Sequence, residues 1–233
     1  QRAKLLVLNY PNSPTGKVAT REFYERVIEF ARTNQIVVVQ DAAHILLTFS
    51  GQPFSFLSVP GAKEVGVEVH SLSKGFNMIG WRLGWVCGHE RIVRALADVK
   101  DNSDSGQFIA IQKAGITALD DDSIPVQIRE KYRRRMTKLV DAMSRCGFVG
   151  RMPGGSYFLY TRSPRGVEGG PEFLTAEAAS QYLITQHSIV TVPWDDAGPF
   201  LRFSVTYEAA DEAAEDALMA ETVRRLTSIR LVF

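Results

Sequence analysis

Lys74 lies in the segment HSLSKGFNMIGWRLGW, residues 70–85, among side chains that suit a phosphorylated carbonyl compound. A lysine at the carboxyl end of an expected strand is either a surface residue or a nucleophilic amine. Ser71 and Ser73 add hydroxyl groups, and Arg82 adds a forked donor suited to phosphate. This combination favours the second interpretation, in which Lys74 forms a Schiff base with an aldehyde and its neighbours hold the phosphate.

Asp41 is a second residue that could do chemistry, because it ends the apolar run VVVQD. In open α/β sheets, ligands bind beyond the carboxyl ends of the strands. Asp41 is therefore either a helix cap or turn residue, or the charge partner of a cationic ligand atom. The segment alone leaves both interpretations open.

The elements that must position these residues alternate between strand and helix. A continuous β-branched run at residues 36–41 predicts a parallel strand buried on both faces. Thr20 can cap a helix that runs to Asn34. Its core face is expected to contain Phe23, Val27 and Ala31. The other expected elements are strands at residues 4–8, 66–73 and 83–88 and helices at residues 90–99 and 107–119. The alternation predicts an α/β fold with a mostly parallel sheet.

The remaining chain has a different pattern, and it predicts a smaller α+β domain. Residues 1–120 are expected to form part of a large domain and residues 121–233 the small one. Expected helices cover residues 124–146, 175–186 and 210–228, expected strands cover residues 154–161, 188–193 and 200–206, and residues 162–172 read as a loop. The last helix is expected to pack through Leu218, Val223 and Leu226.

The composition excludes several classes of protein. A net charge of +1 gives no field that favours nucleic acid or an anionic membrane. No apolar run approaches the roughly 18 residues of a membrane-spanning helix. Cys87 and Cys146 form no C-x-x-C pair, which is typical of reduced, buried thiols in a cytoplasmic protein. The four histidines lack metal-ligand spacing, so no metal site is expected.

Four segments give the chain a family resemblance. NSPTG, DAAH, SLSKGFNMIGWRLGW and FLRFS stand in the order and approximate spacing of the class I/II aminotransferases, which are pyridoxal-phosphate enzymes of fold type I. VPWDDAG and PGGSYFLY resemble the branch that includes LL-diaminopimelate aminotransferases. The resemblance implies an enzyme that moves an amino group from an amino acid to a 2-oxo acid. It also implies a homodimer in the full-length form.

The resemblance assigns roles residue by residue. Lys74 matches the Schiff-base lysine, which also moves the proton during the reaction. Asp41 matches the carboxylate that keeps the pyridine nitrogen protonated. Arg202 matches the arginine that grips the substrate α-carboxylate, the alternative being a surface ion pair. The residues that match the family's phosphate-binding positions are Ser71, Ser73 and Arg82.

Two site positions depart from the family pattern, and both bear on the cofactor's phenolic oxygen. Ser13 stands where the family usually has asparagine, and His44 stands where it usually has tyrosine. Both changes are expected to retune the pKa of the Schiff-base lysine. Elimination, decarboxylation or oxidation of an amino acid with the same cofactor therefore stays open as an alternative.

Length separates this sequence from the family. The family's chains are much longer, and their N-terminal part contributes a ring that stacks on the pyridine and residues of the dimer interface. The sequence is therefore expected to correspond to the catalytic and C-terminal portion. A truncated fragment without catalytic activity is the third hypothesis.

Overall fold

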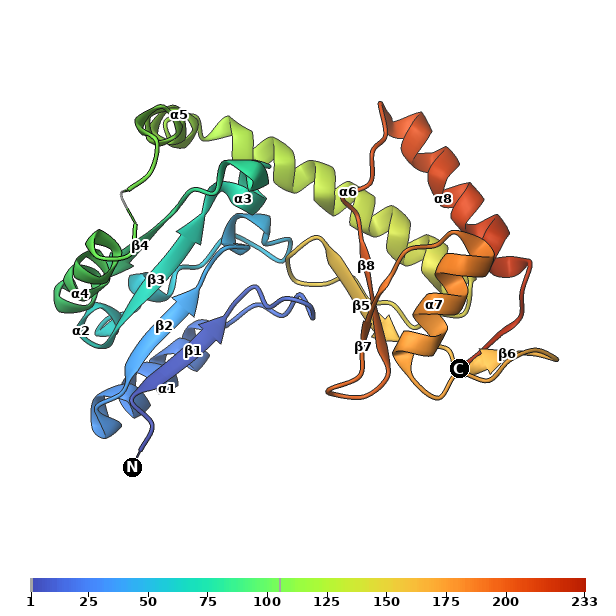
Figure 1. The fold of residues 1–233 in the computed structure, drawn as a ribbon, viewed down its shortest axis with the longest axis horizontal. Coiled ribbons are helices and arrows are strands. Elements are labelled where there is room, and N and C mark those ends of the chain that lie inside the picture. The colour runs from blue at the N-terminus through green and yellow to red at the C-terminus, as the bar shows by residue number, and fades with distance from the viewer. Residues whose placement is uncertain (1, 105) are drawn as a thin grey trace. The chain divides into compact units, whose positions relative to one another are not determined.

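The computed structural model describes residues 2–104 and 106–233 (Figure 1). These residues form two compact units. The first comprises the described residues up to Ser13, together with Lys17–Glu130 and Gly154–Ser156, and the second comprises Pro14–Gly16, Lys131–Pro153 and Tyr157–Phe233. Among the described helices, none is long and apolar enough to cross a membrane.

The first unit is built on a four-stranded sheet in the order β1-β2-β3-β4. Its strands are β1 (Leu5–Asn9), β2 (Val37–Asp41), β3 (Gly66–Ser71) and β4 (Gly84–Gly88). The β1–β2 and β2–β3 pairs are parallel, whereas β4 runs antiparallel to β3. The mostly parallel α/β sheet expected from the sequence is therefore confirmed.

Helix α1 (Arg21–Asn34) covers one face of this sheet. Thr20 caps it by accepting a hydrogen bond from the Phe23 backbone N–H, as the sequence predicts, and such a cap is worth about 1 kcal/mol. Val27 and Ala31 are buried as expected, and Tyr24 and Ile28 are buried beside them. The core face is therefore wider than expected, whereas Phe23 at its edge is only half-buried.

Short helical turns and two further helices complete the first unit. The short elements are η1 (Ile45–Leu47), η2 (Phe56–Ser58), α2 (Ala62–Val65), α3 (Leu72–Gly75) and η3 (Ile79–Trp81), and the longer helices are α4 (Glu90–Asp101) and α5 (Ile109–Leu119). The expected strand at residues 66–73 is two residues too long, because α3 begins at Leu72. There the Ser71 hydroxyl accepts a hydrogen bond from the Ser73 N–H and turns the chain into a helical conformation.

The second unit contains a three-stranded antiparallel sheet in the order β5-β8-β7. Its strands are β5 (Phe158–Arg162), β8 (Phe200–Ser204) and β7 (Val192–Trp194). Leu159, Leu201 and Phe203 are buried and mark the core face of this sheet. The helices of the unit are α7 (Ala176–His187), α8 (Glu212–Thr227) and the part of α6 (Ser123–Arg145) that follows Glu130.

Three sequence expectations for the second unit were wrong. Residues 162–172 contain β6 (Gly166–Val167), which pairs with β9 (Leu231–Val232), and two-residue strands are too short to show a period in the sequence. Residues 188–191 are not strand, because α7 ends at His187 and its C-cap, Ser188, has the left-handed conformation. Leu218 is 37% exposed, and the buried apolar residues of α8 are Met219 together with the expected Val223 and Leu226.

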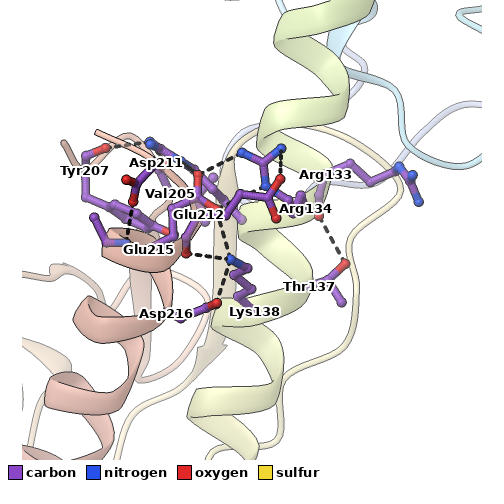
Figure 2. A network of polar contacts seen from close by, with 12 residues as sticks. Arg133, Arg134, Thr137, Lys138, Val205, Tyr207, Asp211, Glu212, Glu215 and Asp216 are labelled. Carbon is purple, nitrogen blue, oxygen red and sulfur yellow. Dashed lines mark hydrogen bonds and ion pairs between the residues drawn. The ribbon is translucent and has the colours of Figure 1, made fainter. Parts of the chain in front are cut away.

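An ion network joins α6 to α8 (Figure 2). Arg135 and Glu215 are 3% and 1% exposed, and their side chains approach to 2.7 Å. Glu215 also pairs with Arg134 at 3.0 Å and with Lys138 at 3.2 Å. Hydrogen bonds from Arg134, Arg135 and Lys138 hold the pKa of the Glu215 carboxyl at about 2 against the raising effect of burial. The network is therefore a buried charge cluster with its anion at the centre.

Cys87 and Cys146 are not bonded to each other. Both are half-buried, rather than fully buried as the sequence suggested. Partial burial raises the pKa of each thiol, so both are weak nucleophiles at neutral pH.

Candidate active site

One edge of the first unit's sheet collects most of the residues that the sequence singled out. Asp41 ends β2 and pairs in register with Val69, two residues before β3 ends at Ser71. The antiparallel β4 starts at the same edge, because Gly84 pairs with Ser71. The carboxyl ends of β1, β2 and β3 and the loop before β4 therefore meet at one place, as expected for a ligand site in an α/β sheet.

Lys74 is held at this edge by α3. The helical turn follows β3 directly and packs against η1, so closely that a Cβ on Gly75 would lie 2.7 Å from the Leu46 Cβ. Only glycine fits there without movement. Lys74 itself is half-buried, and its amine thus lies on a rigid turn rather than on a free loop.

Ser71 and Arg82 come together through the β3–β4 pairing. The Ser71 hydroxyl donates a hydrogen bond to the Leu83 carbonyl at 3.5 Å, and the Leu72 N–H donates to the same oxygen at 3.2 Å. Arg82 has the left-handed backbone conformation, with φ 54° and ψ 45°, which is uncommon for a residue with a side chain. Its carbonyl accepts a hydrogen bond from the Gln107 amide at 2.6 Å, which fixes this conformation.

Arg82 presents an exposed guanidinium at the site. Its side chain donates a hydrogen bond to the Ile79 carbonyl at 2.8 Å. Because Arg carries five N–H donors, this contact leaves donors for a phosphate.

Asp41 is a half-buried carboxylate at the end of β2. One carboxylate oxygen accepts a hydrogen bond from the Ala43 N–H at 3.0 Å. Within the described residues of this unit, no Lys, Arg or His side chain forms an ion pair with Asp41. Ala43 lies two residues after Asp41, so this bond forms an Asx turn, and Asp41 is a turn residue rather than the cap of η1. A carboxylate accepts several hydrogen bonds, so Asp41 can hold this turn and still pair with a ligand cation.

Asn9, at the end of β1, is a site residue that the sequence analysis missed. Its side-chain oxygen accepts hydrogen bonds from the Ser13 N–H at 2.7 Å and from the Asn12 amide at 3.4 Å. Its amide donates to the Asp41 carbonyl at 3.3 Å. Asn9 thus ties the loop that carries Ser13 to the end of β2. The signal that could have found it is its position at a strand's carboxyl end, which it shares with Asp41 and Ser71.

His44 lies three residues after Asp41 and is 5% exposed. It immediately precedes η1, the turn on which α3 packs. The structure thus brings His44, Asp41 and Lys74 to segments that adjoin at the same edge of the sheet.

Arg202 belongs to the second unit, on β8. Its guanidinium carbon lies 4.0 Å from the centroid of the Phe158 ring and 5.7 Å from that of Trp194. Burial lowers the pKa of the Arg202 guanidinium, which nevertheless stays charged at neutral pH. The other seven sequence-predicted site residues all belong to the first unit.

The residues of the first unit suit pyridoxal phosphate chemically. That molecule carries an aldehyde, a phosphate and a basic ring nitrogen. The unit provides an amine on Lys74, hydroxyls on Ser71 and Ser73, a guanidinium on Arg82 and the unpaired carboxylate of Asp41. The aldehyde, the phosphate and the ring nitrogen therefore each have a complementary residue at one edge of the sheet. The described residues contain no group of His, Cys, Asp and Glu suited to a metal ion.

Comparison with known proteins agrees with this chemistry. The family model described as aminotransferase class I and II matches residues 1–217. An LL-diaminopimelate aminotransferase from Methanocaldococcus jannaschii is 52% identical, over 100% of this chain and 57% of the relative. An enzyme of the same name from Methanococcus maripaludis is 50% identical, also over 100% of this chain and 57% of its own length. The chain thus spans 57% of the length of both relatives.

Solved structures share the fold. Substrate-bound BacF from Bacillus subtilis superposes with a TM-score of 0.89 at 31% identity, over 100% of this chain and 57% of that chain. An aminotransferase from Staphylococcus aureus superposes with a TM-score of 0.85 at 25% identity, over 96% of this chain and 58% of that chain. The fold-type-I architecture expected from the sequence is therefore confirmed.

Proposed function

Because the chain belongs to the class I and II aminotransferase family, which uses pyridoxal phosphate, we propose that the whole protein transfers an amino group from an amino acid to a 2-oxo acid. The strongest support is the arrangement at the sheet edge, where the amine of Lys74 follows β3 and the unpaired carboxylate of Asp41 ends the neighbouring β2. A surface lysine would not need the packed turn that holds Lys74.

The proposed reaction assigns a task to each polar group of the first unit. When bound, the cofactor supplies an aldehyde carbon and an electron-accepting ring. Lys74 holds that carbon and moves the proton, because a half-buried amine on a rigid turn can stay within reach of the reacting atoms. Ser71, Ser73 and Arg82 would hold the phosphate, and Ser13 and His44 would interact with the phenolic oxygen. Half-burial of the site limits competing water.

Arg202 has the corresponding task toward the substrate. Its planar guanidinium binds the α-carboxylate through two parallel hydrogen bonds and so sets the orientation of the α-carbon. The proposed substrate is LL-diaminopimelate, the compound in the names of the relatives at 52% and 50% identity.

We also propose how the whole protein is divided into domains, how it assembles and where it is located. Residues 1–120 form part of a cofactor-binding large domain, and residues 121–233 form a small domain. The whole protein is a homodimer in the cytoplasm. Family resemblance supports the dimer, and the two unpaired cysteines support a reducing compartment.

The test uses the full-length protein loaded with pyridoxal phosphate. LL-diaminopimelate is supplied with a panel of 2-oxo acids that includes 2-oxoglutarate. The proposal expects one new amino acid for each amino group lost from the donor. Release of ammonia or CO₂ without amino transfer would instead identify the alternative reactions, and no turnover with any pair would support a non-catalytic role.

Replacing Asp41 with asparagine should lower kcat by about 100- to 1,000-fold, as when one preorganised electrostatic partner of a reacting group is lost. The shape of the side chain is kept, so only the charge beside the cofactor's ring nitrogen disappears. The measurement is the steady-state rate of amino transfer, with Asp98→Asn, an exposed carboxylate of α4, as the matched control. Equal rates in the two variants would remove Asp41 from the reaction.

A further inference from the structure

The outer face of the β5-β8-β7 sheet is lined by aromatic side chains around Arg202. In register, Arg202 lies opposite Tyr160 of β5 and Val192 of β7. Because side chains alternate along a strand, this face is the one opposite the core face. Its aromatic residues are Phe158, Tyr160, Trp194 and Phe200, all half-buried.

Two of these rings lie against the guanidinium, and Tyr160 contacts one of them, Trp194. Phe158 is the nearer, at 4.0 Å from the ring centroid to the guanidinium carbon, and Trp194 follows at 5.7 Å. Tyr160 stacks on Phe200 at 4.6 Å and meets Trp194 edge-on at 6.4 Å. Both distances from Arg202 lie within the range of a cation–π attraction.

Trp194 is also fixed from the backbone. The carboxylate of the next residue, Asp195, accepts hydrogen bonds from the Ala176 N–H at 2.8 Å and the Glu177 N–H at 3.3 Å. These N–H groups begin α7, where a carboxylate is favoured by the helix dipole. The end of β7 is therefore anchored to a helix, and Trp194 with it.

Arg202 differs from the other half-buried or buried arginines of its unit in what surrounds it. Arg135 donates to Glu215 at 2.7 Å and to the carbonyls of Tyr207 and Val205. Within the described residues of the same unit, no carboxylate or carbonyl oxygen accepts a hydrogen bond from Arg202, and rings take their place. A ring attracts a cation through its face but offers no oxygen, so it holds the charge without occupying the donors.

We propose that Phe158 and Trp194 are positioning residues for the substrate carboxylate, which hold the Arg202 guanidinium in place while leaving its N–H groups open to an incoming carboxylate. This inference rests on the proposed role of Arg202 in substrate binding. A carboxylate partner from the protein would hold the arginine as well, but it would compete with the substrate for the same donors. The rings preorganise the cation and avoid that competition.

The experiment measures KM and kcat for LL-diaminopimelate with the full-length, cofactor-loaded enzyme. Phe158→Leu keeps an apolar side chain and removes the ring. Its KM should rise by about 5- to 30-fold, the equivalent of a cation–π contact at a partly desolvated site, with kcat unchanged. Trp194→Leu should raise KM by less, because its ring is farther from the cation.

Two further variants separate positioning from general damage to the fold. Phe158→Tyr keeps the ring and should restore the wild-type KM. Phe200→Leu removes a ring from the same face that stacks on Tyr160 rather than on Arg202, and it should leave KM unchanged. Equal KM values for Phe158→Leu and Phe200→Leu, or no rescue by tyrosine, would overturn the inference. If Phe158→Leu does not fold, the comparison of Trp194→Leu with Phe200→Leu decides in the same way.

Arg202→Ala distinguishes failure of this inference from failure of the proposed function. Its KM should exceed that of every ring variant, because the receptor itself is gone. An unchanged KM in Arg202→Ala would show that the proposed role of Arg202 is wrong, and the inference would fall with it. A raised KM in Arg202→Ala with unchanged ring variants would overturn the inference alone.

Discussion

Replacing Lys74 with alanine is expected to lower the rate of amino transfer by about 10,000-fold, the upper end of what a positioned acid–base group contributes. The amine is the only group at the sheet edge that the proposed reaction uses twice, to hold the aldehyde carbon and to move the proton. Alanine can do neither. The measurement is single-turnover transfer with excess LL-diaminopimelate, so that slow release of product does not mask the chemical step.

The control for this variant is Lys113→Ala, which removes an exposed lysine of α5. Its rate should match that of the wild type. The fold of the Lys74 variant should also be intact, because Gly75 and Leu46, rather than the lysine, make the close contact between α3 and η1. A Lys74→Ala enzyme that retains a tenth of the wild-type rate or more, on the order of 1 kcal/mol in barrier, would exclude the proposed role.

Replacing Glu215 with glutamine is expected to destabilise the protein by about 3–5 kcal/mol, the usual cost of breaking a buried ion pair by removing one partner. Arg135 would remain 3% exposed with no anion beside it. The measurement is the free energy of unfolding in urea for the transition that reports on the second unit. Removing this one buried charge should therefore lower the free energy of unfolding by more than removing any exposed ion pair of the chain.

The matched control is Glu212→Gln on the same helix. Glu212 also pairs with Arg134, at 3.4 Å, but its side chain is 65% exposed. Water screens such a pair, so this variant should lose no more than about 1 kcal/mol. Equal losses in the free energy of unfolding for the two variants would mean that burial does not determine how much each ion pair stabilises the protein.

The same network predicts a pH dependence. The pKa of Glu215 is held at about 2 in the folded protein, below its ordinary value of 4.5. The stabilisation from this group is therefore complete above pH 4.5 and is lost as the pH falls toward 2. Glu215→Gln should lose correspondingly less stability over that interval than the wild type does. An identical acid profile in both proteins would contradict the assignment.

Sequence patterns predicted the elements that have strong periods or caps. Thr20 and the β-branched run of β2 are local signals, and both the helix and the strand formed where expected. The pairing of β6 with β9 joins residues more than sixty positions apart, and no local pattern encodes it. The antiparallel direction of β4 is likewise a tertiary feature, because a local pattern predicts a strand but not the direction in which it pairs.

The residues of the candidate site also fall into two groups, those that the sequence identifies and those that it does not. Lys74, Asp41 and Arg82 carry their chemistry in their side chains, so their types and spacing identify them. Asn9 and Phe158 act on other residues, and folding brings them into contact with the Asp41 carbonyl and with Arg202, each on another strand. Residue type alone does not reveal such contacts, and for Asn9 the one signal in the sequence is its position at the end of an expected strand.

The central claim is that Lys74 is the residue that bonds to pyridoxal phosphate. The direct test is to incubate the full-length protein with the cofactor, reduce it with borohydride, digest it and locate the modified lysine by mass spectrometry. A single reduced adduct is expected, in the peptide that contains Lys74, and none in the Lys74→Ala protein. An adduct on another lysine, or no adduct on the intact protein, would contradict it.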